Sequence, residues 1–520
     1  MMAVTAIIAV TVTTSTVNAL GTTSATRASG QARAAAEAGI DTARVNVQSA
    51  SCASTGVSLS DPGFDYTLFR SDDSHPTATD WDVGCPDATT KYVRVLSNGQ
   101  AQSRGVAGHD SGDDVQLEAI YAWISNTVPT PSLQPAVFAY QMEGALKNFE
   151  LTSSSGSIKS DLLIKKGNVL CSNGARIEGD VILGEGYASL DRCVVKGSLH
   201  VSGYVIAHHA DTVIDGNMTV NGIGVASGAN VVALTSGAVV KGNVYAGGNV
   251  FVDEKQVQQD VTVAGTSSSV LKVGKKGIIS GRAISSGSIT AESGGKITGA
   301  QSPNTGGLAA VPLPQLPNWT DIDMGYPANT YVGYVTIPWV GDCSVGSSHA
   351  FWEGLPVAST LYPNLIVDAR ACGENGLKIT SSSKPIAING NVAFFAYSYD
   401  LDSATVTSAT PDLRYLWFNV PDEIHDAQPS CKYPGTITRM NTEFDTASNI
   451  AAMVYTPCKI KVDRDNWRGH IYGGTIEFKE QAQMTYVQVG LPGYDLKTGT
   501  PLPPPQPPVL GSLVSMRELG

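Results

Sequence analysis

The 520-residue chain carries a net charge of −12 at pH 7, because 46 Asp and Glu residues outnumber 34 Lys and Arg residues. Proteins that bind nucleic acid or anionic membrane surfaces do so through clustered cations, so this balance argues against both as partners. Only 15% of the residues are charged, and Gly, Ser, Thr and Val are abundant, which suits extracellular β structure. The length leaves room for about three or four domains.

The chain begins with an uncharged segment, residues 1–26, that continues into an alanine-rich helix around Arg27–Arg44. At helical spacing, Ala35, Ala38 or Gly39, Thr42 and Val45 share one face. The strongly apolar part is shorter than the ~20 residues that span a bilayer. A secretory signal peptide cut after Ala19 is the alternative.

The run Ala34–Ile40, where the apolar segment becomes an alanine-rich helix, resembles type IV pilin-like minor components of the PilX class. The basic leader and the cleavage-site glycine of that family are not visible here. The resemblance implies that residues 1–50 form an anchoring and assembly helix, with residues 1–26 in the membrane and other pilin-like subunits as partners. It places the assembly surface at Ala35, Glu37, Gly39 and Ile40.

Residues 51–130 are predicted to form a small β-rich module, since Lys91–Leu96 and Val115–Ile124 alternate as strands do. The second strand resembles the one that closes the PilX-like domain. The acidic loop His109–Asp114 lacks the ligand spacing of an EF-hand calcium loop, which favours a solvated turn.

A short phrase recurs between Gly156 and Gly299: apolar pair, polar residue, glycine, polar residue, then alternation. Its glycines are Gly179, Gly197, Gly216, Gly242, Gly281 and Gly299, and Val257–Val263 is a degenerate copy. A strand-like alternation at this short period predicts a parallel β-solenoid over residues 136–300, and a β-sandwich is the alternative. The phrases also resemble bactofilin-like, polymer-forming repeats.

Residues 318–495 are predicted to form a β-rich, aromatic C-terminal domain that either stands apart or completes the solenoid. Trp467–Phe478 and Gly490–Gly493 resemble the closing segment of actinobacterial PilX-like surface proteins. Residues 496–520 read as a proline-rich tail that serves as a spacer, with a docking strand as the alternative. The expected fold is therefore mainly β: a parallel β-solenoid (β-helix) with an N-terminal pilin-like α-helix and a β-rich C-terminal domain.

The eight cysteines contain no CxxC and no zinc-type spacing, and they follow an apolar start, so disulfides in an oxidising compartment are expected. Nearest-neighbour pairing is a hypothesis among the many connectivities that eight cysteines allow. It joins Cys52 to Cys85, Cys171 to Cys193, Cys343 to Cys372 and Cys431 to Cys458.

No catalytic constellation, cofactor site or metal site is evident. Solenoid enzymes need converging carboxylates, whereas Asp180 and Asp215 occupy different phrase positions. The groups His208-His209 with Asp211, Glu423 to Asp426, and Asp463 to Asp465 favour polar turns, and most of the C-terminal Trp residues are expected in the core instead of on a sugar-binding platform.

These observations predict a non-enzymatic, exported protein of the cell surface, membrane-anchored or pilus-associated, with a structural or adhesive role. Its proposed partners include host or environmental glycans. The alternative is a secreted β-helix protein that binds or degrades polysaccharides.

Overall fold

The computed structural model describes residues 2–49, 51–87, 90–102, 114–124, 134–156, 159–346, 349–380, 385–408, 410–441, 444–463, 466–502 and 509–519. The chain divides into two compact units. Unit 1 contains Met1–Thr130 together with Pro503–Gly520, and unit 2 contains Pro131–Leu502. In the order of the chain, unit 2 is therefore an insertion within unit 1.

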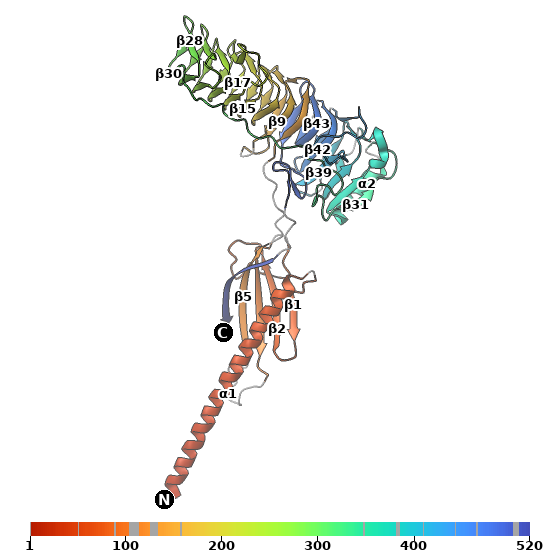
Figure 1. The fold of residues 1–520 in the computed structure, drawn as a ribbon. Helices are drawn as coiled ribbons and strands as arrows, with labels where there is room; N and C mark the ends of the chain where they lie inside the picture. The colour runs from red at the N-terminus through yellow and green to blue at the C-terminus, as the bar shows by residue number, and fades with distance from the viewer. Residues whose placement is uncertain are drawn as a thin grey trace. The chain divides into compact units, whose positions relative to one another are not determined.

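Unit 1 is a long helix on an antiparallel sheet (Figure 1). Helix α1 spans Met2–Val47, and the strands run in the spatial order β1-β2-β4-β5-β47, with β3 beside β2. Their bounds are β1 Thr55–Ser58, β2 Gly63–Ser71, β3 Asp82–Val83, β4 Tyr92–Gln100, β5 Asp114–Ile124 and β47 Val509–Leu519.

Only the C-terminal half of α1 packs on this sheet. A stripe of mostly small residues is buried there at helical spacing: Ala28, Ala32, Ala35, Ala36, Gly39, Ile40, Ala43 and Val47. The backbones approach closely, because a Cβ added to Gly99 of β4 would lie 2.1 Å from the carbonyl oxygen of Ala32. Glycine at this position thus lets the helix sit directly against the strand.

The C-terminal strand β47 completes the sheet of unit 1. It pairs antiparallel with β5, from Val509 opposite Ile124 to Leu519 opposite Gln116. Arg517 Nε donates to Oε1 of the buried Glu118 at 2.7 Å. The segment expected to be a proline-rich tail thus contains a strand in its second half, and residues 503–508 lie outside the described residues.

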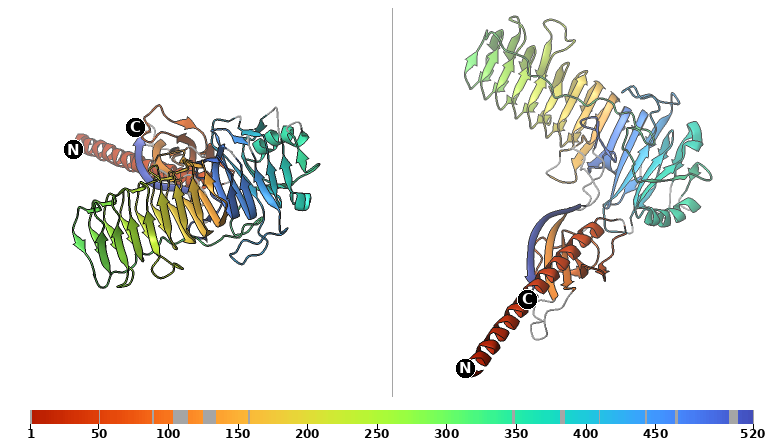
Figure 2. Two further views of the ribbon diagram at one scale, coloured as in Figure 1. Left: turned by 90° about the horizontal axis from the view of Figure 1, so that it is seen from above. Right: turned by 60° about the horizontal axis from the view of Figure 1, so that its bottom comes forward.

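Unit 2 contains the parallel β-solenoid, which confirms the fold class (Figures 1 and 2). The first arm of the solenoid comprises the coils from Val137 to Ser302, and each coil contributes a strand to three faces. The first face contains β6 Val137–Glu143, β9 Leu162–Gly167, β12 Val181–Glu185, β15 Leu199–Val201, β18 Met218–Val220, β21 Val244–Ala246, β24 Val261–Val263, β27 Ala283–Ser285 and β30 Gln301–Ser302.

The other two faces of the first arm follow the same progression. The second face contains β7 Leu146–Lys147, β10 Val169–Ser172, β13 Ala188–Asp191, β16 Val205–His208, β19 Asn230–Leu234, β22 Asn249–Val252, β25 Val270–Val273 and β28 Ser288–Ala291. The third face contains β8 Glu150–Ser153, β11 Arg176–Ile177, β14 Val194–Val195, β17 Val213–Ile214, β20 Val239–Val240, β23 Gln256–Val257, β26 Ile278–Ile279 and β29 Lys296–Ile297.

The repeated phrase forms one corner of the first arm, between its third and first faces. At this corner the repeat glycines stack on one another, and a Cβ added to Gly242 would lie 2.4 Å from the carbonyl oxygen of Gly216. One polar residue of each coil accepts a hydrogen bond here from the backbone N–H of its equivalent in the next coil, and these acceptors are Asp161, Asp180, Ser198, Asn217, Asn243 and Asp260. The acceptor follows the repeat glycine except at Asp161 and Asp260, which follow Ser160 and Gln259. We call this set of hydrogen bonds the corner ladder, and it explains why a polar residue follows the glycine.

The C-terminal region forms a second arm of the same solenoid instead of a separate domain. Its first face contains β31 Val335–Pro338, β33 Asn364–Asp368, β36 Asn391–Phe395, β39 Arg414–Asn419, β42 Ile450–Val462 and β43 Asn466–Phe478. Its other faces contain β32 Ser344–Val345, β34 Leu377–Ile379, β37 Tyr399–Leu401 and β40 Ile437–Met440, with β35 Ile386–Ala387, β38 Thr405–Thr407, β41 Asp445–Thr446 and β44 Gln483–Tyr486. The helix α2, Ala350–Leu361, and the 3-10 helix η1, Arg370–Asn375, also belong to this arm.

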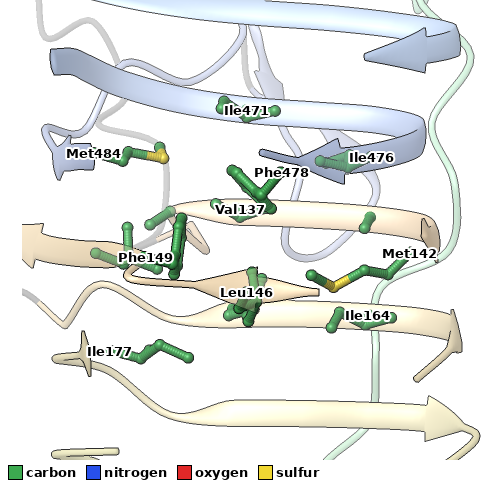
Figure 3. Close-up of a cluster of buried hydrophobic side chains, with 14 of the residues drawn as sticks. Val137, Met142, Leu146, Phe149, Ile164, Ile177, Ile471, Ile476, Phe478 and Met484 are labelled. Atoms are coloured by element: carbon green, nitrogen blue, oxygen red, sulfur yellow. The ribbon is translucent and has the colours of Figure 1, made fainter. Parts of the chain in front are cut away.

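The two arms meet at a junction where the chain enters the solenoid in its middle. Strand β6 pairs on one side with β9 and on the other with β43, and β8 pairs with β44 in the same way. Side chains from both arms share one core there, among them Val137, Phe149, Ile471 and Phe478 (Figure 3). Outside this core, Lys459 bridges Glu143 of β6 at 2.7 Å and Glu477 of β43 at 2.6 Å.

A return segment, residues 303–334, connects the far ends of the two arms. It runs back along the first face and covers the outward side chains there (Figure 1). Trp319 lies against Phe138, Tyr455 and Tyr472, and the Tyr455 hydroxyl donates to the Thr320 carbonyl oxygen at 2.9 Å. These contacts build a second apolar cluster outside the solenoid core.

Candidate functional site

The N-terminal half of α1 exposes a continuous apolar surface. From Ile7 to Leu20, every residue is exposed. The large apolar side chains on this surface are 56–67% exposed, and they are Ile7, Ile8, Val10, Val12, Val17 and Leu20. Full burial of one Val, Leu or Ile side chain contributes about 1.5–3 kcal/mol, so this surface gains considerable free energy when it is covered.

The threonines of this half do not make the helix surface strongly polar. All seven threonines between Ile7 and Thr26 donate their hydroxyl to the carbonyl oxygen four residues earlier, and these are Thr11, Thr13, Thr14, Thr16, Thr22, Thr23 and Thr26. A hydroxyl that is bonded to its own helix needs no water, and its methyl group remains available for packing. The surface therefore suits contact with another helix, where small and threonine side chains allow close approach.

This half of α1 is a poor helix on its own. Twelve of the twenty residues from Ile7 to Thr26 are β-branched, and such residues lose side-chain freedom in a helix. Most helical stability in proteins comes from packing of an apolar face, not from propensity. Propensity therefore contributes little to the stability of this half of α1.

The helices formed by the described residues include none with the length and hydropathy needed to cross a membrane.

The residues assigned to assembly by family resemblance lie in the packed half of α1. Ala35, Gly39 and Ile40 are buried against the sheet of unit 1, whereas Glu37 is exposed and pairs with Arg33 at 3.2 Å. The buried face also differs from the expected one, because Val45 is 75% exposed. The exposed apolar surface of α1 lies earlier, at Ile7–Leu20.

Four disulfides join the nearest-neighbour cysteines. Cys52–Cys85 lies in unit 1, and Cys171–Cys193 joins the second face of the first arm to the following corner. Cys343–Cys372 and Cys431–Cys458 hold loops of the second arm. Four disulfides fit an exported protein, since oxidising compartments are where such bonds persist.

The carboxylates of the first arm have structural partners. Asp180 and Asp260 belong to the corner ladder, and Asp215 pairs with Lys196 at 3.0 Å and Lys241 at 2.8 Å. In the turn after β16, Nδ1 of His209 accepts from the backbone N–H of Asp211 at 3.2 Å. Within the described ranges, no group of three or more His, Cys, Asp and Glu side chains is arranged to hold a metal ion.

The acidic groups of the second arm also serve its loops. Glu423 accepts from the Tyr397 hydroxyl at 2.7 Å and from Lys432 at 2.8 Å, while the ring of His425 stacks on Tyr326. Residues 464 and 465 of the Asp463–Asp465 group lie outside the described residues, as does the His109–Asp114 loop apart from Asp114.

One buried carboxylate pair links the return segment to the loop after β39. Asp422 accepts from Trp319 Nε1 at 2.9 Å and from the backbone N–H of Ser430 at 3.1 Å, and Asp321 accepts from the backbone N–H of Ala427 at 2.8 Å. Burial, with a smaller contribution from the nearby Asp321 carboxylate, raises the pKa of Asp422 to about 6. The surrounding groups are N–H donors, which suit a structural carboxylate.

The tryptophans of the second arm and return segment are buried, and they form no surface platform. Their exposed fractions are 6% or less for Trp319, Trp339, Trp352, Trp417 and Trp467. An open polar pocket of about 230 Å³ lies elsewhere on this arm, where Glu374, Asp400, Thr436 and Arg439 contribute to its wall. Sequence periodicity gave no signal for this pocket, because its walls combine loop residues with residues of β37 and β40 from three different coils.

No family model matches the sequence, and no curated protein matches it. A solved structure, the competence-associated pilin ComZ from Thermus thermophilus, matches with a TM-score of 0.20 and 11% identity, over 94% of this chain and 97% of that chain. A TM-score of 0.20 is too low to assign a shared fold.

Proposed function

We propose that this protein is a non-enzymatic, exported structural subunit that assembles through the N-terminal half of α1 and presents its solenoid outside the cell. The single observation that carries the proposal is the exposed apolar surface from Ile7 to Leu20 on a helix whose other half is packed in its own unit. Such a surface supports burial among the helices of other pilin-like subunits, with the membrane as the place where the subunit resides before assembly. The PilX-like resemblance of residues 34–40 supports the same assignment.

The test compares two substitutions on the same helix. Val12→Lys with Val17→Lys places charge on the exposed surface, and Val45→Lys places the same charge on the solvent face of the packed half. The cells that produce the protein are separated into medium, sheared surface filaments and membranes, and the protein is quantified in each fraction. We expect the wild type and the Val45→Lys variant to be recovered with filaments or membranes. The amount of the double variant in these fractions is expected to be at least tenfold lower.

A wild-type protein that is free in the medium with its helix intact would overturn the proposal. Equal distribution of the double variant and Val45→Lys would also overturn it, because the exposed surface would then have no role in retention. Recovery in membranes alone, with none in filaments, would support anchoring and reject assembly into a filament.

The adhesive part of the proposal concerns the polar pocket of the second arm. Two of its walls are the segments that follow Cys431 and surround Cys372, so disulfides hold both in place. Carboxylate, amide and guanidinium groups on fixed walls suit a hydroxyl-rich ligand such as a glycan. Glycan-array binding that is lost in Arg439→Ala and retained in Arg414→Ala, which lies outside the pocket, is the expected result. Identical glycan binding by both variants would show that the glycan does not bind in this pocket.

A further inference from the structure

The last coil of the first arm, formed by β28, β29 and β30, lacks a closed core. The strand registers place Ile289 and Ala291 over Leu271 and Val273, Ile297 over Ile279, and Gln301 over Ala283. All four residues of the lower coil are 0% exposed. By contrast, Ala291 and Gln301 are exposed, and Ile289 and Ile297 are half-buried.

The strands of this coil are also edge strands. The registers pair β28 with β25, β29 with β26 and β30 with β27, and they give none of the three a partner on its other side among the described residues. Free N–H and C=O groups on a sheet edge are a template for another strand. We call this open coil end the tip (Figure 1, β28 and β30).

At the opposite end of the solenoid the apolar core is covered. Trp352 and Leu355 of α2 are buried in the solenoid core, and Trp352 contacts Trp339 at a ring distance of 5.9 Å. The registers give the outermost strands there, β31 and β32, no second partner among the described residues, but β31 ends in Pro338, a residue that disfavours edge pairing. Of the two ends, the tip is the one where the described residues leave the core uncovered.

The junction shows that coils far apart in the chain dock in this molecule through edge pairing and a shared core. Strands β43 and β6 pair in register, from Ile471 opposite Val137 to Glu477 opposite Glu143, and their coils bury Phe478 against Phe149 (Figure 3). These strands are parallel, so the junction joins two unlike coil ends, which match in width and in the position of their inward side chains.

We propose that two copies of this protein associate tip to tip, through β28, β29 and β30, in a closed two-fold dimer. A two-fold axis makes the facing strands antiparallel, and antiparallel edges satisfy each other's N–H and C=O groups. The last coil contains one acidic and one basic side chain, Glu292 and Lys296, so two identical tips do not repel through net charge. Because α2 covers the core at the opposite end, the same pairing does not repeat there, and association ends at two copies without a solenoid filament.

The test uses the full chain that carries Val12→Lys and Val17→Lys, which limits association through α1. Ile289→Lys changes a half-buried inward position of the tip, and Thr290→Lys is the matched control on the outward side of the same strand. Light scattering across a concentration series gives the molar mass. We expect the parent chain and the Thr290→Lys variant to have twice the monomer mass. The Ile289→Lys variant is expected to have the monomer mass.

A second measurement separates tip pairing from association through α1. All cysteines of the chain are in disulfides, so a spin label attached to Ser293→Cys at the tip is specific, and Thr336→Cys in β31 marks the opposite end. Tip pairing gives a short intermolecular label distance for Ser293→Cys and none for Thr336→Cys. The proposal fails if the parent chain is monomeric at every concentration, if both lysine variants behave alike, or if neither label gives a short distance.

Unchanged circular dichroism of Ile289→Lys shows that the variant is folded. Ile297→Lys, on another face of the same coil, repeats the test at an independent position and is expected to give the monomer mass as well.

Discussion

Gly242 shows that the close stacking of coils at the corner requires glycine at this position. A Cβ added there would lie 2.4 Å from the carbonyl oxygen of Gly216 and 2.7 Å from Asn217 Oδ1, so the coil below must move. We expect Gly242→Ala to reduce the free energy of unfolding of unit 2 by about 1–3 kcal/mol, as overpacking does.

Urea unfolding, followed by tryptophan fluorescence, measures this change. Gly306→Ala is the control, because a Cβ added to Gly306 meets no atom within 4 Å. A Gly242→Ala variant as stable as Gly306→Ala would show that the corner relaxes without cost.

Asp422 makes the stability of unit 2 depend on pH. Its pKa is raised to about 6, so the folded state binds the proton more tightly than the unfolded chain, whose carboxyl titrates near pH ~3.9. The resulting stabilisation is complete below the unfolded pKa and is lost as pH rises through about 6. Its size is up to about 3 kcal/mol for a shift of about two pKa units.

Asp422→Asn keeps an oxygen acceptor for Trp319 and Ser430 but does not titrate. Denaturant unfolding at pH values between 4 and 7 is expected to show a smaller loss of stability with rising pH in the variant. If the free energy of unfolding changed with pH in the same way in both proteins, Asp422 would not be the cause of the pH dependence.

At the residue scale, the sequence predicted positions that repeat and missed those that do not. The degenerate copy Val257–Val263 was recognised because Asp260 keeps the polar position after the corner, and the structure places Asp260 in the corner ladder. Trp319 carried no comparable signal, since it lies in an irregular segment and is buried by contacts with β6, β42 and β43.

Among the elements, the Cys171–Cys193 bridge closes a short loop between consecutive turns of the first arm. Both sulfur positions are buried, so alanine is the appropriate replacement because it introduces no buried hydroxyl. We expect Cys171→Ala with Cys193→Ala to lower the free energy of unfolding by about 2–4 kcal/mol. The urea midpoint of the double variant tests this, and a midpoint equal to that of the wild type would contradict it.

Strand β47 is expected to protect β5 from solvent exchange. Removal of residues 503–520 leaves the hydrogen-bonding edge of β5 open and deprives the buried Glu118 of Arg517. Hydrogen exchange measured by mass spectrometry should then accelerate in β5 and remain unchanged in unit 2. Val514→Lys, at an exposed position of β47, is the control that preserves protection. Unaltered exchange of β5 after truncation would show that the pairing does not form in solution.

The elements differ in how visible they were in the sequence. The strands of the first arm follow a local alternation, whereas β47 was hidden because the proline-rich run before it suggested a tail. The face of α1 that is buried differs from the face that helical spacing grouped together. Its contacts depend on a close approach of the backbones at Gly39 and Gly99, and sequence periodicity does not indicate such an approach.

For the whole molecule, the junction is expected to hold the arms together without the covalent link between them. A protease site inserted between Gly306 and Gly307, at exposed positions of the return segment, allows this link to be cut after folding. The test uses a chain that lacks residues 503–520, because β47 would otherwise also hold the two fragments together through β5. We expect this cut protein to migrate as one species in native size-exclusion chromatography and as two fragments after reduction and denaturation. Separation under native conditions would mean that the pairing of β43 with β6 is too weak to join the arms.

This arrangement was beyond prediction from the sequence. The periodic phrase identifies a coil but not its neighbour, so nothing local indicates that Ile471 lies beside Val137. The late coil at Trp467–Phe478 left open whether the C-terminal region completes the solenoid, and only long-range pairing decides between the two arrangements.

The insertion of unit 2 between β5 and β47 also determines how tension passes through the protein. Both connections leave unit 1 from the paired ends Ile124 and Val509, so a pull on the solenoid is shared by two neighbouring strands. Within the solenoid, the chain enters beside β6 and leaves after β44, next to the junction. A force between these two points bypasses both arms, which can therefore remain folded while the subunit bears load.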